Sequence, residues 1–321
     1  DVAYLNGSYN AEGEGNLDAS LTLQDIPVEL FNPFIPDQVV SLRGNVAGVL
    51  SVKGPTSALV YNGDIVPSDV HVSTDMYSVD LRLANDTISI KDSKLMFSKF
   101  LLYGAGERPL TINGNVDFSD MENMGISLAV YGRNFKLIEA KRSGRSLVFG
   151  DVYADFFTRV TGTINDMRVR GMLNVLNSTD VTYIMSSNSV IYQGDRLDDI
   201  VTFVDFSRPP DHDAQLVNKS FVGVDMQMTL NVEEGARFNC ELSPDRQSYV
   251  NVQGGGSVVM TYTPEGVLTL QGRLTVNEGE MKYNLSSVVP LKTFTIANGS
   301  YVEFRSEEHT SELQSHLNLV C

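Results

Sequence analysis

The sequence predicts an all-β fold made of many short strands joined by hairpin turns. Apolar and polar residues alternate strictly in FVGVDMQMTLNVEEG, from Phe221 to Gly235, as in a strand with one apolar and one polar face. Turn-type sequences, namely YNGD, NGN, TPEG and NEGE, recur between such runs. Helical periodicity is nearly absent: only FSKFLL from Phe97 and FKLIEAKR from Phe135 suggest a helical turn or two.

Strand patterns continue along the whole chain. Alternation is present from Val2 onward and recurs in SVDLRL and TISI. A loose repeat, with Gly followed by a small polar and then an apolar residue, occurs at 43–54, from 113, and at 161–171, but it gives no fixed period. The last third adds VVMTY and GVLTLQGRLTV, ending at Val276.

The number of strands limits how they can be arranged. A turn about every 12 residues predicts on the order of 25 strands. Open sheets rarely exceed about 10 strands without curling or splitting. The residues alone leave stacked sandwiches, a solenoid and a long curved trough open. Stacked in one row at about 4.8 Å, the strands would extend about 120 Å.

Composition excludes several classes of function. The chain is 42% hydrophobic, with a formal net charge of −16 and a pI near 4.6. This acidity argues against binding nucleic acid or anionic membrane surfaces through a basic patch. No apolar run approaches the roughly 18 residues needed to span a bilayer.

The usual signatures of catalysis and metal binding are missing. Nucleotide-binding, nucleophile-elbow and zinc-protease motifs do not occur, and the triple Gly in VQGGGSV predicts a bulged turn. PPDHDA, at 209–214, offers two Asp and a His to a metal ion, but alone in a polar segment it predicts a solvated turn. Adjacent acids such as Glu233 and Glu234 point to opposite faces of a strand. Cys240 is expected to be a strand residue. We therefore predict no enzyme, no catalytic residue, no metal and no cofactor.

Two glycines interrupt otherwise regular alternation near the C-terminus. We expect Gly272 and Gly279 to lie where a strand bends or where φ is positive.

The last residues differ in character from the rest. RSEEHTSELQSH, from Arg305 to His316, resembles the conceptual translation of a sequencing adapter. Residues 305–321 are therefore predicted to be foreign to the fold. Together with the start inside an alternating pattern, this suggests a fragment of a longer protein.

The order of the C-terminal motifs carries a family resemblance. VFGDVYADFFTRVTGTINDMRVRGMLNVLNSTDVTYIM precedes NVQGGGSVVMTYTPEGVLTLQGRLTVNEGEMKYNL and then KTFTIANGSYVEF. This order resembles the C-terminal domain of TamB-type translocation and assembly proteins, in the AsmA-like superfamily of bridge-like lipid transfer proteins. The upstream LTLQDIPVELFNPFIPDQVVSLRGNVAGVLSVKG resembles AsmA-like repeats. The resemblance predicts an AsmA-like region at 1–140, a truncated TamB-type domain at 141–304 and the foreign tail at 305–321.

The resemblance implies a fold and a function. The fold is a long β-sheet curved into an open, taco-like trough with an apolar concave face. The function is a periplasmic bridge, in a diderm bacterium, that carries phospholipid between inner and outer membrane and supports outer-membrane biogenesis. Phospholipid acyl chains and an Omp85-type outer-membrane protein are the implied partners, and the family's inner-membrane helix is not seen in this chain. An assembly factor for outer-membrane or autotransporter proteins and a β-solenoid adhesin are the alternatives.

The alternating strands then become candidates for a lipid groove. The residues predicted to line it are Val222, Val224, Met226, Met228, Leu230, Val232, Val258, Met260, Tyr262, Leu268, Leu270, Leu274, Val276, Met281, Tyr283 and Leu285.

Overall fold

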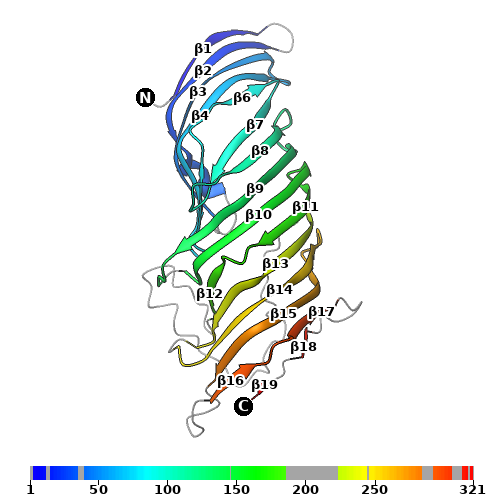
Figure 1. Cartoon of the computed structure of the whole chain (residues 1–321). Coiled ribbons are helices and arrows are strands. Elements are labelled where there is room, and N and C mark those ends of the chain that lie inside the picture. Colours follow the sequence, from blue (N-terminus) through cyan, green and yellow to red (C-terminus); the bar gives the residue numbers. More distant parts are fainter. Residues whose placement is uncertain are drawn as a thin grey trace, which may run out of the picture.

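The described residues form one long sheet of nineteen strands (Figure 1). The computed structural model describes residues 3–11, 15–34, 40–144, 146–185, 223–243, 246–283, 292–305, 313–316 and 319–320. The all-β prediction is confirmed, and the single helix within these ranges is the 3₁₀ helix η1 (Val28–Phe34). No helix in this part of the chain is long and apolar enough to span a membrane.

The strands have the following bounds. Those of the N-terminal part are β1 (Ala3–Asn10), β2 (Asn16–Pro27), β3 (Ser41–Pro55), β4 (Val60–Thr74), β5 (Val79–Leu83), β6 (Ile88–Lys91), β7 (Lys94–Tyr103), β8 (Leu110–Asp117) and β9 (Gly125–Ala140). Those of the C-terminal part are β10 (Val148–Thr163), β11 (Asp166–Val175), β12 (Asp180–Ile184), β13 (Val224–Glu241), β14 (Tyr249–Tyr262), β15 (Leu268–Tyr283), β16 (Lys292–Ile296), β17 (Ser300–Phe304), β18 (Leu313–His316) and β19 (Leu319–Val320).

Spatial order follows chain order. The pairs β5/β6, β11/β12, β16/β17 and β18/β19 each form one interrupted row, so nineteen strands make fifteen rows. Pairing is antiparallel except where β13 runs parallel to β11 and β12. At about 4.8 Å per row the sheet extends roughly 65–70 Å. The expectation of about 25 short strands was wrong, since the described strands are fewer and β13 alone has 18 residues.

Several predicted turns are strand positions instead. TPEG does join β14 to β15, but YNGD lies inside β4, NGN inside β8 and NEGE inside β15. Gly114 shows the reason: its φ is +124°, and a Cβ there would lie 1.9 Å from the carbonyl oxygen of Ser127 on β9. In this Asn-Gly sequence the glycine allows two strands to approach closely, and the chain does not reverse direction there.

The two stretches expected to form helical turns are also strands. FSKFLL lies in β7, and FKLIEAKR lies in β9 except for its last two residues, which follow the strand. Each strand carries a β-bulge, with Lys99 at φ 54° and Asn134 at φ 48°. An extra residue in a bulge shifts the alternation by one position and so imitates helical spacing.

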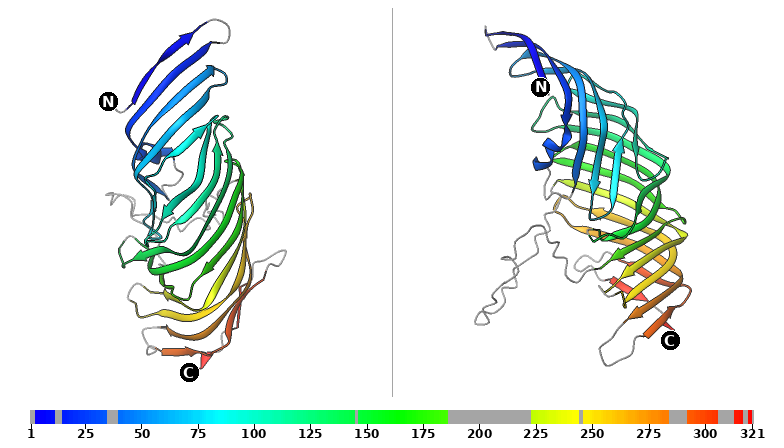
Figure 2. Two further views of the ribbon diagram at one scale, coloured as in Figure 1. Left: turned by 45° about the horizontal axis from the view of Figure 1, so that its top comes forward. Right: turned by 90° about the vertical axis from the view of Figure 1, so that its left-hand side faces the viewer.

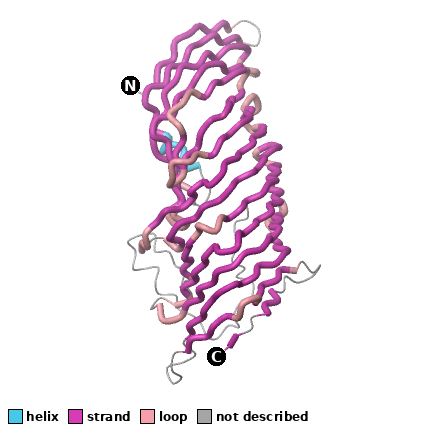
Figure 3. The backbone as a smooth tube through the Cα atoms, in the orientation of Figure 1, coloured by secondary structure: helices cyan, strands magenta, loops and turns pink. Residues whose placement is uncertain are grey.

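The sheet is curved and has a single layer. Figure 2 shows the strands bowing along their length, and the backbone trace in Figure 3 shows no second sheet stacked on the first among the described residues. Sandwich and solenoid arrangements are thereby excluded for this part of the chain. The predicted boundary at 140/141 falls between β9 and β10, which pair over most of their length, and the division into domains stays a prediction.

The predicted foreign tail lies mostly outside the described residues. Its described strands, β18 and β19, pair with β17 and β16 at the end of the sheet. An unpaired strand edge accepts almost any backbone within reach, so pairing does not reveal whether a segment was selected for it.

We predict that deleting residues 305–321 leaves the midpoint of chemical denaturation unchanged. Among the described residues the Arg305 side chain pairs with Glu303, and ion pairs near the surface contribute little to stability. Denaturation of the full and shortened chains by urea tests this. A clearly lower midpoint for the shortened chain would show that the tail belongs to the fold.

We predict that Gly272→Val destabilises the protein by more than the ~1 kcal/mol span of strand propensities. Gly272 has φ +143°, as expected, and a Cβ there would lie 2.2 Å from the carbonyl oxygen of Ser257. Gly279 is not among the positive-φ residues and lies just beyond a bulge in β15. Gly144→Val is the control, because a Cβ at Gly144 meets nothing within 4 Å. Equal denaturation midpoints for the two variants would contradict the prediction.

Candidate functional site

Strand register gathers the predicted groove residues on one face of the sheet. Met228 lies opposite Met260 on β14, and Met260 lies opposite Leu270 on β15. In the next position Leu230 lies opposite Val258. Directly paired residues share a face, so the alternation noticed in one strand continues across its neighbours.

The predicted set can be placed almost completely. The members that this register puts on one face are Val224, Met226, Met228, Leu230, Val232, Val258, Met260, Tyr262, Leu268, Leu270, Leu274, Val276, Met281 and Tyr283. Val222 and Leu285 lie outside the described residues. Whether this face contacts lipid stays a prediction.

The same face continues into strands that the sequence prediction did not include. On β11, Leu173 lies opposite Leu230, and it pairs in turn with Phe156 on β10. Further members toward the N-terminus are Leu128, Val130, Ile112, Phe100, Leu95, Ile90, Ile65, Leu50 and Leu21. The alternation in DMRVRGMLNV was the available signal, since Met167, Val169, Leu173 and Val175 repeat the spacing seen in β13.

The opposite face is polar over the same strands. On β13 it carries Asp225, Gln227, Thr229 and Asn231. The Arg170 guanidinium donates to the Asp225 carboxylate at 2.6 Å, and this hydrogen bond lowers the pKa of Asp225. The two side chains are 44% and 33% exposed, so this charge-assisted contact lies on a solvent-exposed face.

A line of irregularities crosses the sheet from β9 to β17; we call it the crease. It consists of the bulge at Asn134, the gap between β11 and β12, the bulge at 233–235, the bulge at Asn277 and the gap between β16 and β17. The bulge at Asn134 lies across β10 from the gap between β11 and β12, and from that gap onward each element lies opposite the next by register. Because a bulge bends its strand, aligned bulges bend the whole sheet along one line.

The most buried side chains on the apolar face lie along the crease. Phe135 and Ala236 are 0% exposed and Ala154 is 1% exposed, although the described residues form a single layer. Side chains converge in this way only on the inner side of a bend. Burial therefore shows that the apolar face is concave, with the crease as its floor.

Polar side chains satisfy the backbone where the crease interrupts pairing. Thr179, 1% exposed, accepts the Tyr153 N–H at 3.1 Å and donates to the Tyr153 carbonyl oxygen at 3.2 Å. Asp155 accepts the N–H of Asn134 at 2.7 Å, and Glu233 accepts that of Asn177 at 2.9 Å. These bonds replace ladder bonds that the bulges remove.

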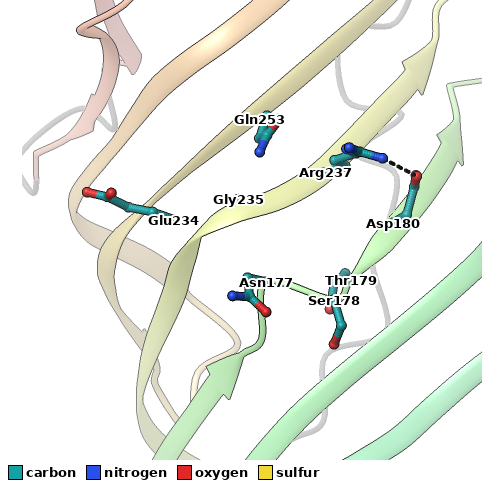
Figure 4. A pocket seen from close by; sticks show the side chains of 8 residues that line it. All are labelled: Asn177, Ser178, Thr179, Asp180, Glu234, Gly235, Arg237 and Gln253. Atoms are coloured by element: carbon teal, nitrogen blue, oxygen red, sulfur yellow. Dashed lines mark ion pairs between the residues drawn. The ribbon is translucent and has the colours of Figure 1, made fainter.

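A polar hollow of about 410 Å³ opens at the crease (Figure 4). Arg237 faces Asp180 across it at 3.7 Å, and both side chains are more than half exposed. Glu234 and Gln253 complete the polar wall. The arrangement holds no nucleophile paired with a base, and we assign it no chemistry.

Cys240 is a half-buried strand residue of β13. It lies on the apolar face opposite Val250 and Tyr183. Burial raises the pKa of the Cys240 thiol, and the neighbouring Glu241 adds to this effect. A raised pKa disfavours the thiolate that nucleophilic chemistry requires. Within the described residues no cluster of His, Cys, Asp and Glu suits a metal ion, and the PPDHDA segment lies outside them.

Comparison with known proteins identifies one family. Residues 101–310 match the family model described as the TamB C-terminal domain. No curated protein and no solved structure matches the chain.

We predict that Thr179→Val destabilises the protein by about 1–3 kcal/mol, because it leaves the Tyr153 N–H without a partner, whereas the Tyr153 carbonyl oxygen keeps its bond from the Leu176 N–H. The substitution preserves side-chain shape, so packing changes little. Thr229→Val, on the outer face, is the control and should change stability by less than about 0.5 kcal/mol. Urea denaturation of both variants measures the difference, and equal midpoints would show that the crease does not depend on this hydroxyl.

Proposed function

Because this chain belongs to the TamB family, whose members act as translocation and assembly modules of the bacterial cell envelope, we propose that its concave face conducts phospholipid acyl chains through the periplasm. The observation that carries the proposal is the continuity of that face. Register places at least one apolar residue on it in every strand row from β2 to β15. Phospholipid moving between inner and outer membrane is the proposed cargo.

The energetics of lipid transfer favour such a surface. Each CH₂ moved into water costs about 0.8 kcal/mol, so an acyl chain of ~16 carbons faces a cost of order 12 kcal/mol. A trough that keeps the chain in apolar contact lowers this cost throughout the path. The sheet's length of roughly 65–70 Å exceeds the ~40–45 Å thickness of a bilayer, so it suits a path between membranes.

The side chains of the face suit a moving cargo. Met226, Met228, Met260 and Met281 share it. Methionine is unbranched and polarisable, and it adapts to partners of varying shape. Their location together supports a surface that binds many positions of an acyl chain rather than one.

The family context supplies the proposed setting. An Omp85-type outer-membrane protein is the proposed partner at the C-terminal end, and the periplasm is the proposed compartment. A role without catalysis agrees with a family of transport and assembly proteins.

The test places a photocrosslinking residue at Met228 and, in a separate variant, an aspartate. We expect the crosslinker to capture phospholipid in cells. Met228→Asp should shift the melting temperature by only a few degrees, because the site wets when it is empty, and should abolish lipid capture by a crosslinker at Met260. In a closed core the same unpaired charge would cost several kcal/mol and would lower the melting temperature strongly.

Gln227 provides the matched control. It is the next residue on β13, exposed on the polar face. A crosslinker there should capture no phospholipid, and Gln227→Asp should leave capture at Met260 intact. Equal lipid capture at both positions, or capture of unfolded outer-membrane protein at Met228 in place of lipid, would overturn the proposal. The second result would favour an assembly factor.

A further inference from the structure

An apolar patch interrupts the polar outer face. Tyr131 on β9, Phe157 on β10 and Met172 on β11 lie directly opposite one another in adjacent strands. Their exposed fractions are 40%, 70% and 39%, and Phe157 has the highest value among the exposed large hydrophobic residues that the structure describes. The residues that pair with the two ends of this cluster are polar: Thr111 on β8 lies opposite Tyr131, and Thr229 on β13 lies opposite Met172. An aromatic and methionine cluster in this setting resembles the centre of a protein interface.

The patch contains a cavity of a definite size. Tyr131, Phe157 and Met172 line a space of about 350 Å³, which lies next to the bulge at Asn134. The Tyr131 hydroxyl is fixed by the Asn113 amide at 3.3 Å. Such a cavity accepts one large apolar side chain, and it lies on the face opposite the groove.

The patch is basic, although the chain carries a net charge of −16. Arg159 is two residues from Phe157 on the same face, and it lies directly opposite Arg170. Like charges directly opposite each other destabilise a strand pair. Arg170 is compensated by Asp225, whereas Arg159 and Arg133 make no ion pair among the described residues. Asp155, the acid that borders the cavity, is engaged by the N–H of Asn134.

We propose that this outer-face patch docks an acidic protein segment that carries one large apolar side chain. The apolar side chain fills the cavity against Phe157, and its flanking carboxylates pair with Arg159 and Arg133. The inference concerns the outer face and does not depend on lipid transport by the inner one.

The test selects short random displayed peptides on the purified chain. We expect the selected peptides to be rich in Asp and Glu around a single Phe, Leu or Trp. Phe157→Ser should weaken their binding on the order of tenfold or more, as for a central interface residue. Arg159→Ser should weaken binding less, with an effect that fades as salt rises. Gln227→Ser is the control and should bind as the unchanged chain does.

Three outcomes would overturn the proposal. In the first, the selected peptides bind Phe157→Ser as tightly as the unchanged chain, and the two proteins have the same melting temperature. Another is loss of self-association in Phe157→Ser, which would make the patch a contact between copies of the chain. In the last, the chain binds vesicles of anionic phospholipid, and Phe157→Ser and Arg159→Ser weaken this binding as much as they weaken peptide binding, or more. That result would make the patch a membrane-binding surface.

Discussion

Strand register is the constraint on which the rest of this structure depends. A single-layer sheet has no second layer to correct an error, and a slip of one residue moves every apolar side chain to the wet face. Along the crease from β11 to β17, each irregularity is met by another on the neighbouring strand. The extra residues at 233–235 lie opposite Gly255, next to the shift at Gln253 and Gly254, which lies opposite Asn277. Val232 and Ala236 therefore stay on the same face on both sides of the bulge.

The crease solves a problem of burial. A flat single layer would leave its apolar face fully exposed, and folding needs buried apolar area to offset chain entropy. Bending along the crease brings side chains of the same face together: Val175, Val232 and Ala236 form a buried cluster against Leu230 and Phe238. The floor thereby stabilises the sheet, while residues farther from it, such as Leu268 at 52% exposure, remain accessible.

The sequence predicted the faces of this sheet better than the ends of its strands. Alternation through Met226, Met228 and Leu230 identified the apolar face because a period of two survives any strand length. Turn sequences failed for a physical reason: Asn-Gly in β8 serves a positive φ inside a strand as well as it serves a hairpin. The crease was hidden because its residues look like breaks in the pattern when only one strand is read. Phe135 illustrates this, since it begins a stretch that resembles a helical turn and lies on the floor of the trough. The parallel joint between β11 and β13 depends on a distant pairing that no local pattern encodes.

For the proposed role, the distribution of polar groups matters as much as the apolar surface. A cargo moves along a path when successive positions bind it about equally, and hydrophobic contact provides this because it has no direction. A hydrogen-bonding group on the floor would create a site where a lipid headgroup stops. The crease needs such groups to satisfy its backbone, and it keeps them out of the path: the Thr179 hydroxyl is bonded in both directions by Tyr153, and the carboxylates of Asp155 and Glu233 act from the outer face. The bend that gives the trough its shape is therefore held by polar side chains, while its concave surface remains mostly apolar, with Thr158 and Ser300 as polar residues on that face.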